Sequence, residues 1–218
     1  MTDDLMRSIP RLDPGFVAPK SLPGAIEDNS TEGDERLDVG GPPAIALGNP
    51  EASITLKQLQ DTPEFRAYRS YADDFSAFLA NKVSLRYFRA HEFLAMGGDH
   101  GTPGANCYGR NSLPPRELWD NVINLTRVLD EVRHRLGASV TLNSVYRNQA
   151  YNSCLQGTAA HSRHMRFDAA DIVCHDSRRP PDWHRVVKEL RSEGFFKGGI
   201  GLYNSFVHVD TRGNNADW

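Results

Sequence analysis

The order of two hydrophobic patterns constrains the fold of this chain more than any other feature. Apolar side chains at three- and four-residue spacing, typical of amphipathic helices, occur first, within residues 62–82 and 114–136. Short apolar or alternating runs, typical of strands, all come later, between residues 139 and 210. Helices that precede several short strands predict an α+β fold with a small, mostly antiparallel sheet and flanking helices.

The predicted elements have recognisable ends. A Gly-, Asn- and Pro-rich stretch over residues 96–113 predicts a long loop between the first two helices. The second helix begins at Pro114 or Pro115 and ends at Gly137, which suits a C-cap. The remaining predicted elements are a helix at residues 181–194 and strands at residues 139–144, 169–173, 200–202 and 206–210, the last two forming a hairpin.

Residues 1–50 differ from the rest of the chain. They hold seven of the 13 prolines and show neither a helical nor a strand period. Such a segment buries too little apolar surface to offset its chain entropy. We therefore predict a disordered or extended arm over residues 1–50 and one folded domain over residues 51–218.

Composition excludes several classes of protein. The formal net charge is −3, and residues 1–50 carry nine acidic against four basic side chains, so no strong basic stripe indicates a nucleic-acid binder. No run approaches the ~20 apolar residues of a membrane span. The first residues, MTDDLMRSIP, lack the basic start and apolar stretch of a classical signal peptide.

Three cysteines, Cys107, Cys154 and Cys174, occur without a Cys-x-x-Cys pair. An odd count argues against a disulfide scaffold, so we predict buried free thiols. A single bridge between Cys107 and Cys154 is the alternative if the protein works outside the reducing cytosol.

Two short strands carry polar side chains that suit a metal site. In FVHVD, a period of two places His208 and Asp210 on one face and two valines on the other. In AADIV, Asp171 is a lone carboxylate in an apolar run, which is costly unless it is paired or metal-bound. His164 lies in the loop before that strand. Spacing alone leaves two interpretations open, a metal site and a set of hydrogen-bonded structural residues.

Three stretches resemble the zinc D-alanyl-D-alanine carboxypeptidases and related murein peptidases. SRHMRFDAADI resembles their Ser-x-His-x-x-Gly-x-Ala-x-Asp signature, LNSVYRNQAYN the Ser-Gly-Tyr-Arg-x-x-x-Tyr-Asn stretch before it, and GIGLYNSFVHVDTRG their closing segment. The resemblance covers roughly residues 85–218 and implies the fold that this family shares with the amino-terminal domain of hedgehog proteins. It implies a Zn²⁺ ion bound by His164, Asp171 and His208.

The resemblance also implies roles for neighbouring residues. Arg147 corresponds to an arginine that holds the substrate's carboxylate or the developing oxyanion, and Ser144 and Ser162 to serines that hold the site by hydrogen bonds. The catalytic base of the family usually stands three residues before the last histidine, where this chain has Ser205. Asp210 is the substitute, either as the base or as a group that only orients the neighbouring histidine.

The matched segment departs from the family pattern at further positions. Phe167 stands where the family has glycine, so we expect a rearranged loop and a bulkier cleft wall. Asp168 is expected to be solvated. His161 lies outside the matched ligand positions and is expected to face solvent, with a place in the cleft wall as the alternative.

The resemblance implies a zinc peptidase that hydrolyses peptide bonds next to D-amino acids in peptidoglycan stem peptides. A D-Ala-D-Ala carboxypeptidase and a murein endopeptidase both fit, as does a phage lysis enzyme as biological context. The expected protein is a monomer that acts at the cell wall or in the periplasm. The alternative of another class is a non-catalytic zinc module that binds wall fragments or a partner protein.

Overall fold

A small five-stranded sheet organises the protein. A computed structural model describes residues 63–218, so the predicted arm at residues 1–50 lies outside the described residues. The strand order is β1-β2-β4-β3-β5, and the neighbours are antiparallel except for β3 and β5. The strands are β1 (Val140–Ser144), β2 (Ala169–Cys174), β3 (Gly199–Leu202), β4 (Val207–Asp210) and β5 (Ala216–Asp217). The predicted α+β fold with a mostly antiparallel sheet is confirmed.

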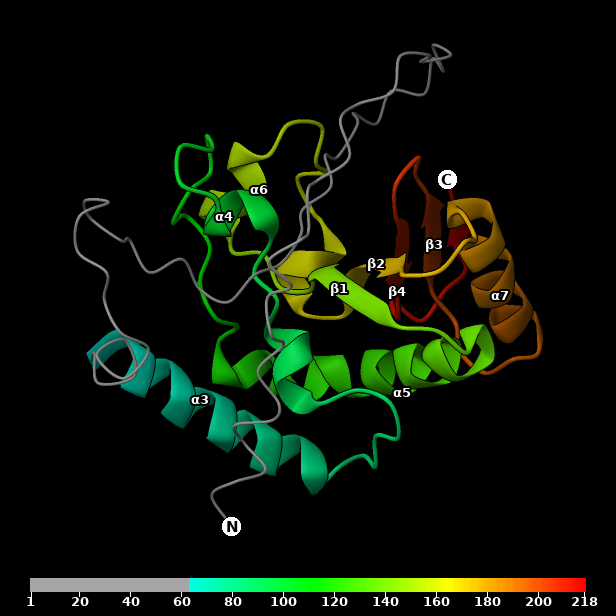
Figure 1. Cartoon of the computed structure of the whole chain (residues 1–218), viewed down its shortest axis with the longest axis horizontal. Helices are drawn as coiled ribbons and strands as arrows, with labels where there is room; N and C mark the ends of the chain where they lie inside the picture. The colour runs from blue at the N-terminus through cyan, green and yellow to red at the C-terminus, as the bar shows by residue number, and fades with distance from the viewer. Residues whose placement is uncertain (1–62) are drawn as a thin grey trace. The chain divides into compact units, whose positions relative to one another are not determined.

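Three long helices flank this sheet. Figure 1 shows α5 (Trp119–Leu136) between the sheet and α3 (Pro63–Ala80), with α7 (Pro180–Ser192) beside β3. The predicted long helices and four of the strands are confirmed, whereas β5 was not predicted. Shorter helical segments complete the described chain: η1 (Ala90–Leu94), α4 (Gly98–Gly101), η2 (Arg116–Leu118), α6 (Gln149–Cys154) and η3 (Arg163–Arg166).

The apolar stripe of α5 builds the core. Its side chains at positions 122, 125, 129 and 132 are buried, as their helical spacing predicts. The helix ends where Gly137 takes a left-handed conformation (φ 62°) and donates its N–H to the carbonyls of Arg133 and His134. Phe75 of α3 packs against the first residue of α5, with its ring centroid 5.2 Å from that of Trp119.

The register between β2 and β4 positions the candidate site. Asp171 pairs directly with His208, and Ala169 with Asp210. Val207 and Val209 are buried in the apolar core, so the alternating face carries the polar side chains, as predicted.

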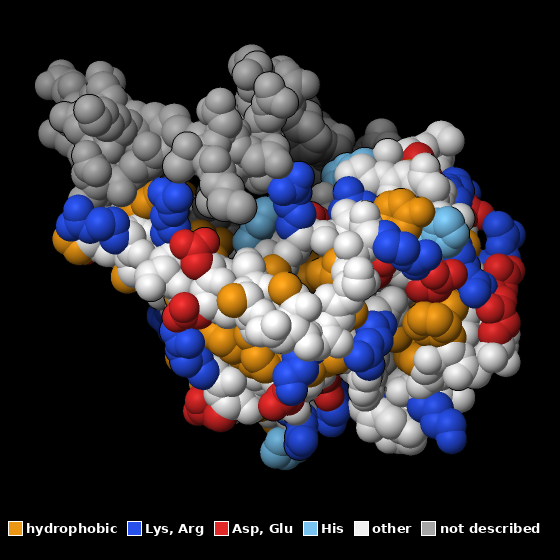
Figure 2. Space-filling view, turned by 90° about the horizontal axis from the view of Figure 1, so that it is seen from below, with side chains coloured by type: hydrophobic (Ala, Val, Ile, Leu, Met, Phe, Trp, Pro, Cys, Tyr) orange, Lys and Arg blue, Asp and Glu red, His pale blue; other side chains and the backbone are white. Residues whose placement is uncertain are grey.

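The described surface carries mixed charge. On the face shown in Figure 2, Lys and Arg side chains alternate with Asp and Glu side chains rather than gathering in a basic stripe. Among residues 63–218, no helix is long and apolar enough to cross a membrane.

A disulfide joins the long loop to α6. Cys107 and Cys154 are bonded with a Cα–Cα distance of 5.8 Å, and Cys174 is a buried free cysteine. The prediction of three free thiols is therefore wrong, and the alternative bridge is confirmed. Burial raises the pKa of the Cys174 thiol to about 11, which makes it a poor nucleophile at neutral pH.

Thiol counting tests this pairing. After denaturation without reductant, we expect one reactive thiol per chain from Cys174, and three after reduction. The bridge joins residues 47 apart in the sequence and so restricts the unfolded chain. The double variant Cys107→Ala/Cys154→Ala should therefore have a free energy of unfolding about 4 kcal/mol lower than wild type. Cys174→Ala is the single-cysteine control, and three reactive thiols without reductant would contradict the pairing.

A buried carboxylate on α5 fixes the segment between α3 and η1. Asp130 accepts hydrogen bonds from the backbone N–H groups of Arg86, Tyr87 and Phe88, and from Arg86 Nε. Burial alone would raise the pKa of Asp130, but these hydrogen bonds to the charged form hold the pKa below its usual value. The carboxylate therefore contributes to stability only while it is ionised.

Replacing this carboxylate gives a pH-dependent loss of stability. Asp130→Asn should lower the free energy of unfolding at pH 7 by about 2 kcal/mol, because buried N–H donors lose a charged acceptor. The folded pKa is depressed, so this difference from wild type should persist above pH ~4 and shrink as pH falls below that value. Urea unfolding at a series of pH values measures it. Asp120→Asn, an exposed change on the same helix, is the control and should shift stability by less than about 0.5 kcal/mol.

Candidate metal centre

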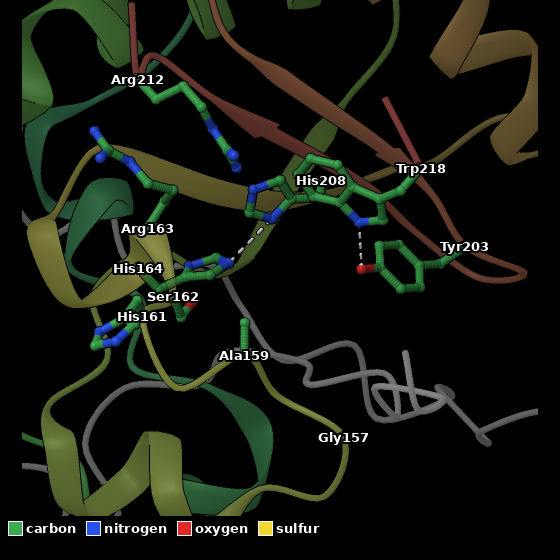
Figure 3. A pocket seen from close by; sticks show the side chains of 10 residues that line it. All are labelled: Gly157, Ala159, His161, Ser162, Arg163, His164, Tyr203, His208, Arg212 and Trp218. Carbon is green, nitrogen blue, oxygen red and sulfur yellow. Dashed lines mark hydrogen bonds between the residues drawn. The ribbon is translucent and has the colours of Figure 1, made fainter. Parts of the chain in front are cut away.

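Three side chains from separate elements converge at one point. His164 lies in η3, Asp171 in β2 and His208 in β4, and all three are buried. Asp171 Oδ1 is 3.2 Å from His164 Nε2 and 3.0 Å from His208 Nδ1, and the two nitrogens are 3.2 Å apart. Figure 3 shows the two imidazoles pointing toward one another. These residues form a group that could hold a metal ion.

The spacing of the three atoms matches one four-coordinate ion. Metal–ligand bonds of about 2.0–2.1 Å in a tetrahedron separate neighbouring ligand atoms by roughly 3.3–3.4 Å. The observed separations of 3.0, 3.2 and 3.2 Å are only slightly shorter. The site therefore fits a single ion with one remaining coordination position.

Hydrogen bonds at the far side of each imidazole fix its tautomer. His164 Nδ1 is 3.0 Å from the Val145 carbonyl, which only accepts, so Nδ1 carries the proton and Nε2 presents a lone pair. His208 Nε2 is 3.3 Å from Asp210 Oδ2 and is the donor there, so Nδ1 is the nitrogen that would give up its proton and offer a lone pair to a metal ion. The two inner nitrogens and a carboxylate oxygen thus face one another, an arrangement that a metal cation between them would satisfy.

The electrostatics of the group favour positive charge at the same point. Burial lowers the pKa of His208, but hydrogen bonds to Asp171 and Asp210 outweigh it and raise the pKa to about 9. Burial would raise the pKa of Asp171, yet His164 and Arg147 hold it well below its usual value. Burial, followed by the charge of Arg147, lowers the pKa of His164. Neutral His164 and ionised Asp171 are the protonation states that bind metals.

A buried arginine holds the second oxygen of Asp171. Arg147 is 2% exposed, pairs through Nη2 with Asp171 Oδ2, and donates from Nε to Ser144 Oγ at 2.9 Å. Its backbone N–H also donates to the carbonyl of His164 at 3.3 Å. These contacts leave Oδ1 of Asp171 directed at the two histidines.

Asp210 is enclosed on all sides. It is 0% exposed, and its carboxylate accepts from Gly199 N at 2.9 Å, from the backbone N–H and guanidinium of Arg212, and from His208 Nε2. Burial opposes ionisation, but His208 and Arg212 outweigh it and lower the pKa of Asp210. A Cβ on residue 199 would lie 2.4 Å from Oδ2, so glycine is needed for this approach.

One side of the group opens into a pocket of about 200 Å³ (Figure 3). His164 and His208 reach its surface, and Ser162 lines it as well. Among the described lining residues, none is Asp or Glu. The other lining residues are Gly157, Ala159, His161, Arg163, Tyr203, Arg212 and Trp218.

Sequence reasoning missed six of these pocket residues, of which Gly157 and Ala159 have no side chain or a small one and the other four have large side chains. Arg163, Tyr203 and Arg212 stand inside the stretches that resemble the peptidase family, so their position in those stretches was the available signal. Trp218 lies beyond every such stretch, and no motif pointed to it. His161 is exposed and also lines the pocket, so the expectation of a solvent-facing residue and the alternative of a place in the cleft wall are both confirmed.

Phe167 takes the backbone conformation that a glycine would take. It lies in the left-handed region at φ 60° and ψ 32°, which costs a residue with a Cβ roughly 1–2 kcal/mol. Its side chain is fully buried, with ring centroids 5.9 Å from Phe75 and 6.1 Å from Tyr146. The prediction of a bulkier cleft wall is wrong, because the ring fills the core beside the site instead.

Asp168 is also placed differently from expectation. It is buried, and its carboxylate forms a two-point pair with the guanidinium of Arg163. Burial raises the pKa of Asp168, against the opposing effect of Arg163. The expectation of a solvated carboxylate is therefore wrong.

Comparison with known proteins identifies the family of this chain. The model of the Peptidase M15 family matches residues 94–210, more than half of the chain. The chain belongs to the Peptidase M15 family. Neither the curated proteins nor the solved structures gave a match. Membership of Peptidase M15 implies a metallopeptidase, and the matched range contains all three members of the His-Asp-His group.

Metal content tests the centre directly. We expect one divalent ion per wild-type chain, and a loss of affinity greater than about 100-fold in His164→Ala, since removal of groups outside the ligand set already costs 10–100-fold. Arg147→Met, which changes a residue outside the ligand set, should lower the metal affinity by about 10–100-fold. Elemental mass spectrometry after dialysis and competition with a chelator measure both effects. His161→Ala, a pocket change outside the group, should retain the ion, and equal retention in His164→Ala would contradict the site.

Proposed function

We propose that this M15 protein is a zinc-dependent peptidase that hydrolyses peptide bonds next to D-amino acids in peptidoglycan. A D-Ala-D-Ala carboxypeptidase and a murein endopeptidase are the two forms of this activity. The observation that carries the proposal is a buried His164–Asp171–His208 group with one side open to a pocket. Two imidazole nitrogens and one carboxylate oxygen with an open fourth position are typical of catalytic zinc.

Each protein group has a defined task in this proposal. Bound zinc would polarise the scissile carbonyl and lower the pKa of a water molecule. Arg147 restrains Asp171 through Oδ2, and Ser144 restrains the guanidinium of Arg147. The backbone carbonyl of Val145 and the carboxylate of Asp210 keep the two imidazoles in the tautomers that present lone pairs.

Arg147 as a direct ligand of the substrate stays a prediction. Its 2% exposure and its bonds to Ser144 and Asp171 support an orienting role. Arg163 and Arg212 line the pocket, and their side chains are about a quarter exposed, so we propose that they provide the positive charge that a peptide carboxylate meets.

Asp210 has the contacts of an orienting group. A general base must reach the water whose proton it takes, and Asp210 is fully enclosed with both oxygens already accepting hydrogen bonds. Its lowered pKa also makes it a weak base. We therefore propose that Asp210 positions His208, and the base role stays a prediction with less support.

A second candidate function is a zinc module that binds wall peptides without cleaving them. Ser205 occupies the position where the resemblance places the base, and none of the described pocket residues is a carboxylate. The Cys107–Cys154 bridge suits either function at the cell wall or in the periplasm, because disulfides persist in oxidising compartments.

Digestion of purified peptidoglycan by the zinc-loaded protein separates these candidates. New muropeptides, identified by mass spectrometry, would name the bond that is cut, whereas binding without cleavage would favour the zinc module. Asp210→Asn should weaken zinc binding by about 10–100-fold and lower kcat through zinc loss, with activity recovered at high zinc. A kcat lower by about 100-fold or more at full zinc occupancy would instead identify Asp210 as the base. Asp73→Asn, an exposed change on α3, is the matched control.

A further inference from the structure

Trp218 is the one tryptophan of this chain with an exposed ring. Trp119 and Trp183 lie in the core, whereas Trp218 is 40% exposed and lines the pocket beside His208 (Figure 3). It lies outside the residues that the M15 model matches. Its contacts in the structure, rather than the matched range, therefore have to show what it does.

The backbone of Trp218 is fastened to the edge of the sheet. Leu202 N donates to Trp218 O at 2.9 Å, and Trp218 N donates to Ile200 O at 3.3 Å. The buried guanidinium of Arg191 on α7 bonds the carbonyl of Ala216 at 2.9 Å and both carboxylate oxygens of Asp217. The two residues before the tryptophan are thus anchored to a helix as well as to β3.

The indole ring is fixed by its neighbours. Its Nε1–H donates to Tyr203 Oη at 2.7 Å, and its centroid is 5.2 Å from that of the His208 ring. The guanidinium of Arg212 lies 5.2 Å above the ring. A Cβ at residue 201 would come within 2.5 Å of the indole nitrogen, so Gly201 leaves the space that the ring occupies.

A rigid aromatic ring that stays partly exposed is suited to binding. Fixed tryptophan and tyrosine rings contribute large contact areas at little entropic cost, which is why they dominate binding hot spots. The opposite side of the pocket is formed by Gly157 and Ala159, whose side chains are absent or small (Figure 3). The absent and small side chains on that side leave a pocket of about 200 Å³ facing the indole.

We propose that Trp218, held by Tyr203, is a specificity-determining residue whose exposed ring binds the small apolar side chain of the substrate residue next to the scissile bond. The inference rests on the proposed peptidase function and extends it to a residue outside the matched range. The ring adjoins His208, so a residue bound against it lies next to the candidate metal position.

Kinetics of two substitutions test the role. With a synthetic stem peptide ending in D-Ala-D-Ala and zinc-loaded protein, Trp218→Ala should raise KM by ~10-fold, as expected for loss of one apolar contact in a pocket. kcat and zinc content should stay within about threefold of wild type, and Trp218→Phe should recover most of the affinity. Phe195→Ala removes an aromatic ring that is 50% exposed and does not line the pocket, and it should behave as wild type.

Fluorescence provides a readout that does not depend on turnover. Because Trp119 and Trp183 are buried, acrylamide should quench mainly Trp218. We expect the peptide, or its non-hydrolysable analogue, to protect this emission from quenching, and the protection to be absent in Trp218→Phe. Unchanged quenching at a peptide concentration that saturates the enzyme would overturn the proposal.

The outcomes separate this inference from the proposed function. Cleavage with unchanged KM in Trp218→Ala would overturn the role of the ring and leave the peptidase standing. A fall in zinc affinity with unchanged KM would make Trp218 a support for His208, which also overturns the proposal. A wild-type protein that binds peptide with protection of Trp218 but does not cleave it would support the binding role and overturn the peptidase. Absence of both binding and cleavage would overturn both.

Discussion

The pairing of Asp171 with His208 across β2 and β4 is the contact on which the site depends. It places a carboxylate oxygen 3.0 Å from an imidazole nitrogen, and both residues are buried. His164 completes the group from a separate segment, and its backbone is tied to Arg147 and its ring to Val145. If either strand slipped by one residue, its own polar side chain, Asp171 or His208, would turn into the core, so the two-residue period and the register together determine whether the site exists.

Two arginine–carboxylate ion pairs support the His-Asp-His group. Arg147 pairs with one oxygen of Asp171, and Arg212 pairs with Asp210, whose carboxylate in turn orients His208. Buried ions are costly unless each is paired and hydrogen-bonded, and Asp210 also accepts a hydrogen bond from the backbone N–H of Gly199. Burying these charged groups costs free energy. Their ion pairs and hydrogen bonds also keep the ligand atoms directed at one point, which is the preorganisation that metal binding requires.

Local pattern was sufficient to predict the three long helices and four of the five strands, because helix and strand periods act over a few residues. The three candidate ligands came from the resemblance to the murein peptidases, since spacing alone left a structural interpretation open. Local pattern was insufficient where side chains meet across long separations. The pairing of Cys107 with Cys154 depends on how the long loop packs on α6. The prediction for the Phe167 side chain was wrong because its ring packs against Phe75, which lies on a helix almost a hundred residues earlier in the chain. Asp168 was judged by its polarity alone, although a neighbouring arginine allows it to be buried.

The site has two parts, the His-Asp-His group and the aromatic pocket wall that Trp218 provides. The His-Asp-His group lies within residues 94–210, where the M15 family pattern is found, and its geometry follows from ligand chemistry. The aromatic wall comes from Trp218, which reaches the pocket only because β5 pairs in parallel with β3 and Gly201 leaves room for the indole. Metal ligands tolerate little displacement, whereas a pocket wall can change with the substrate. Trp218 lines the pocket outside the His-Asp-His group, and it is therefore the position at which we propose that the substrate is selected.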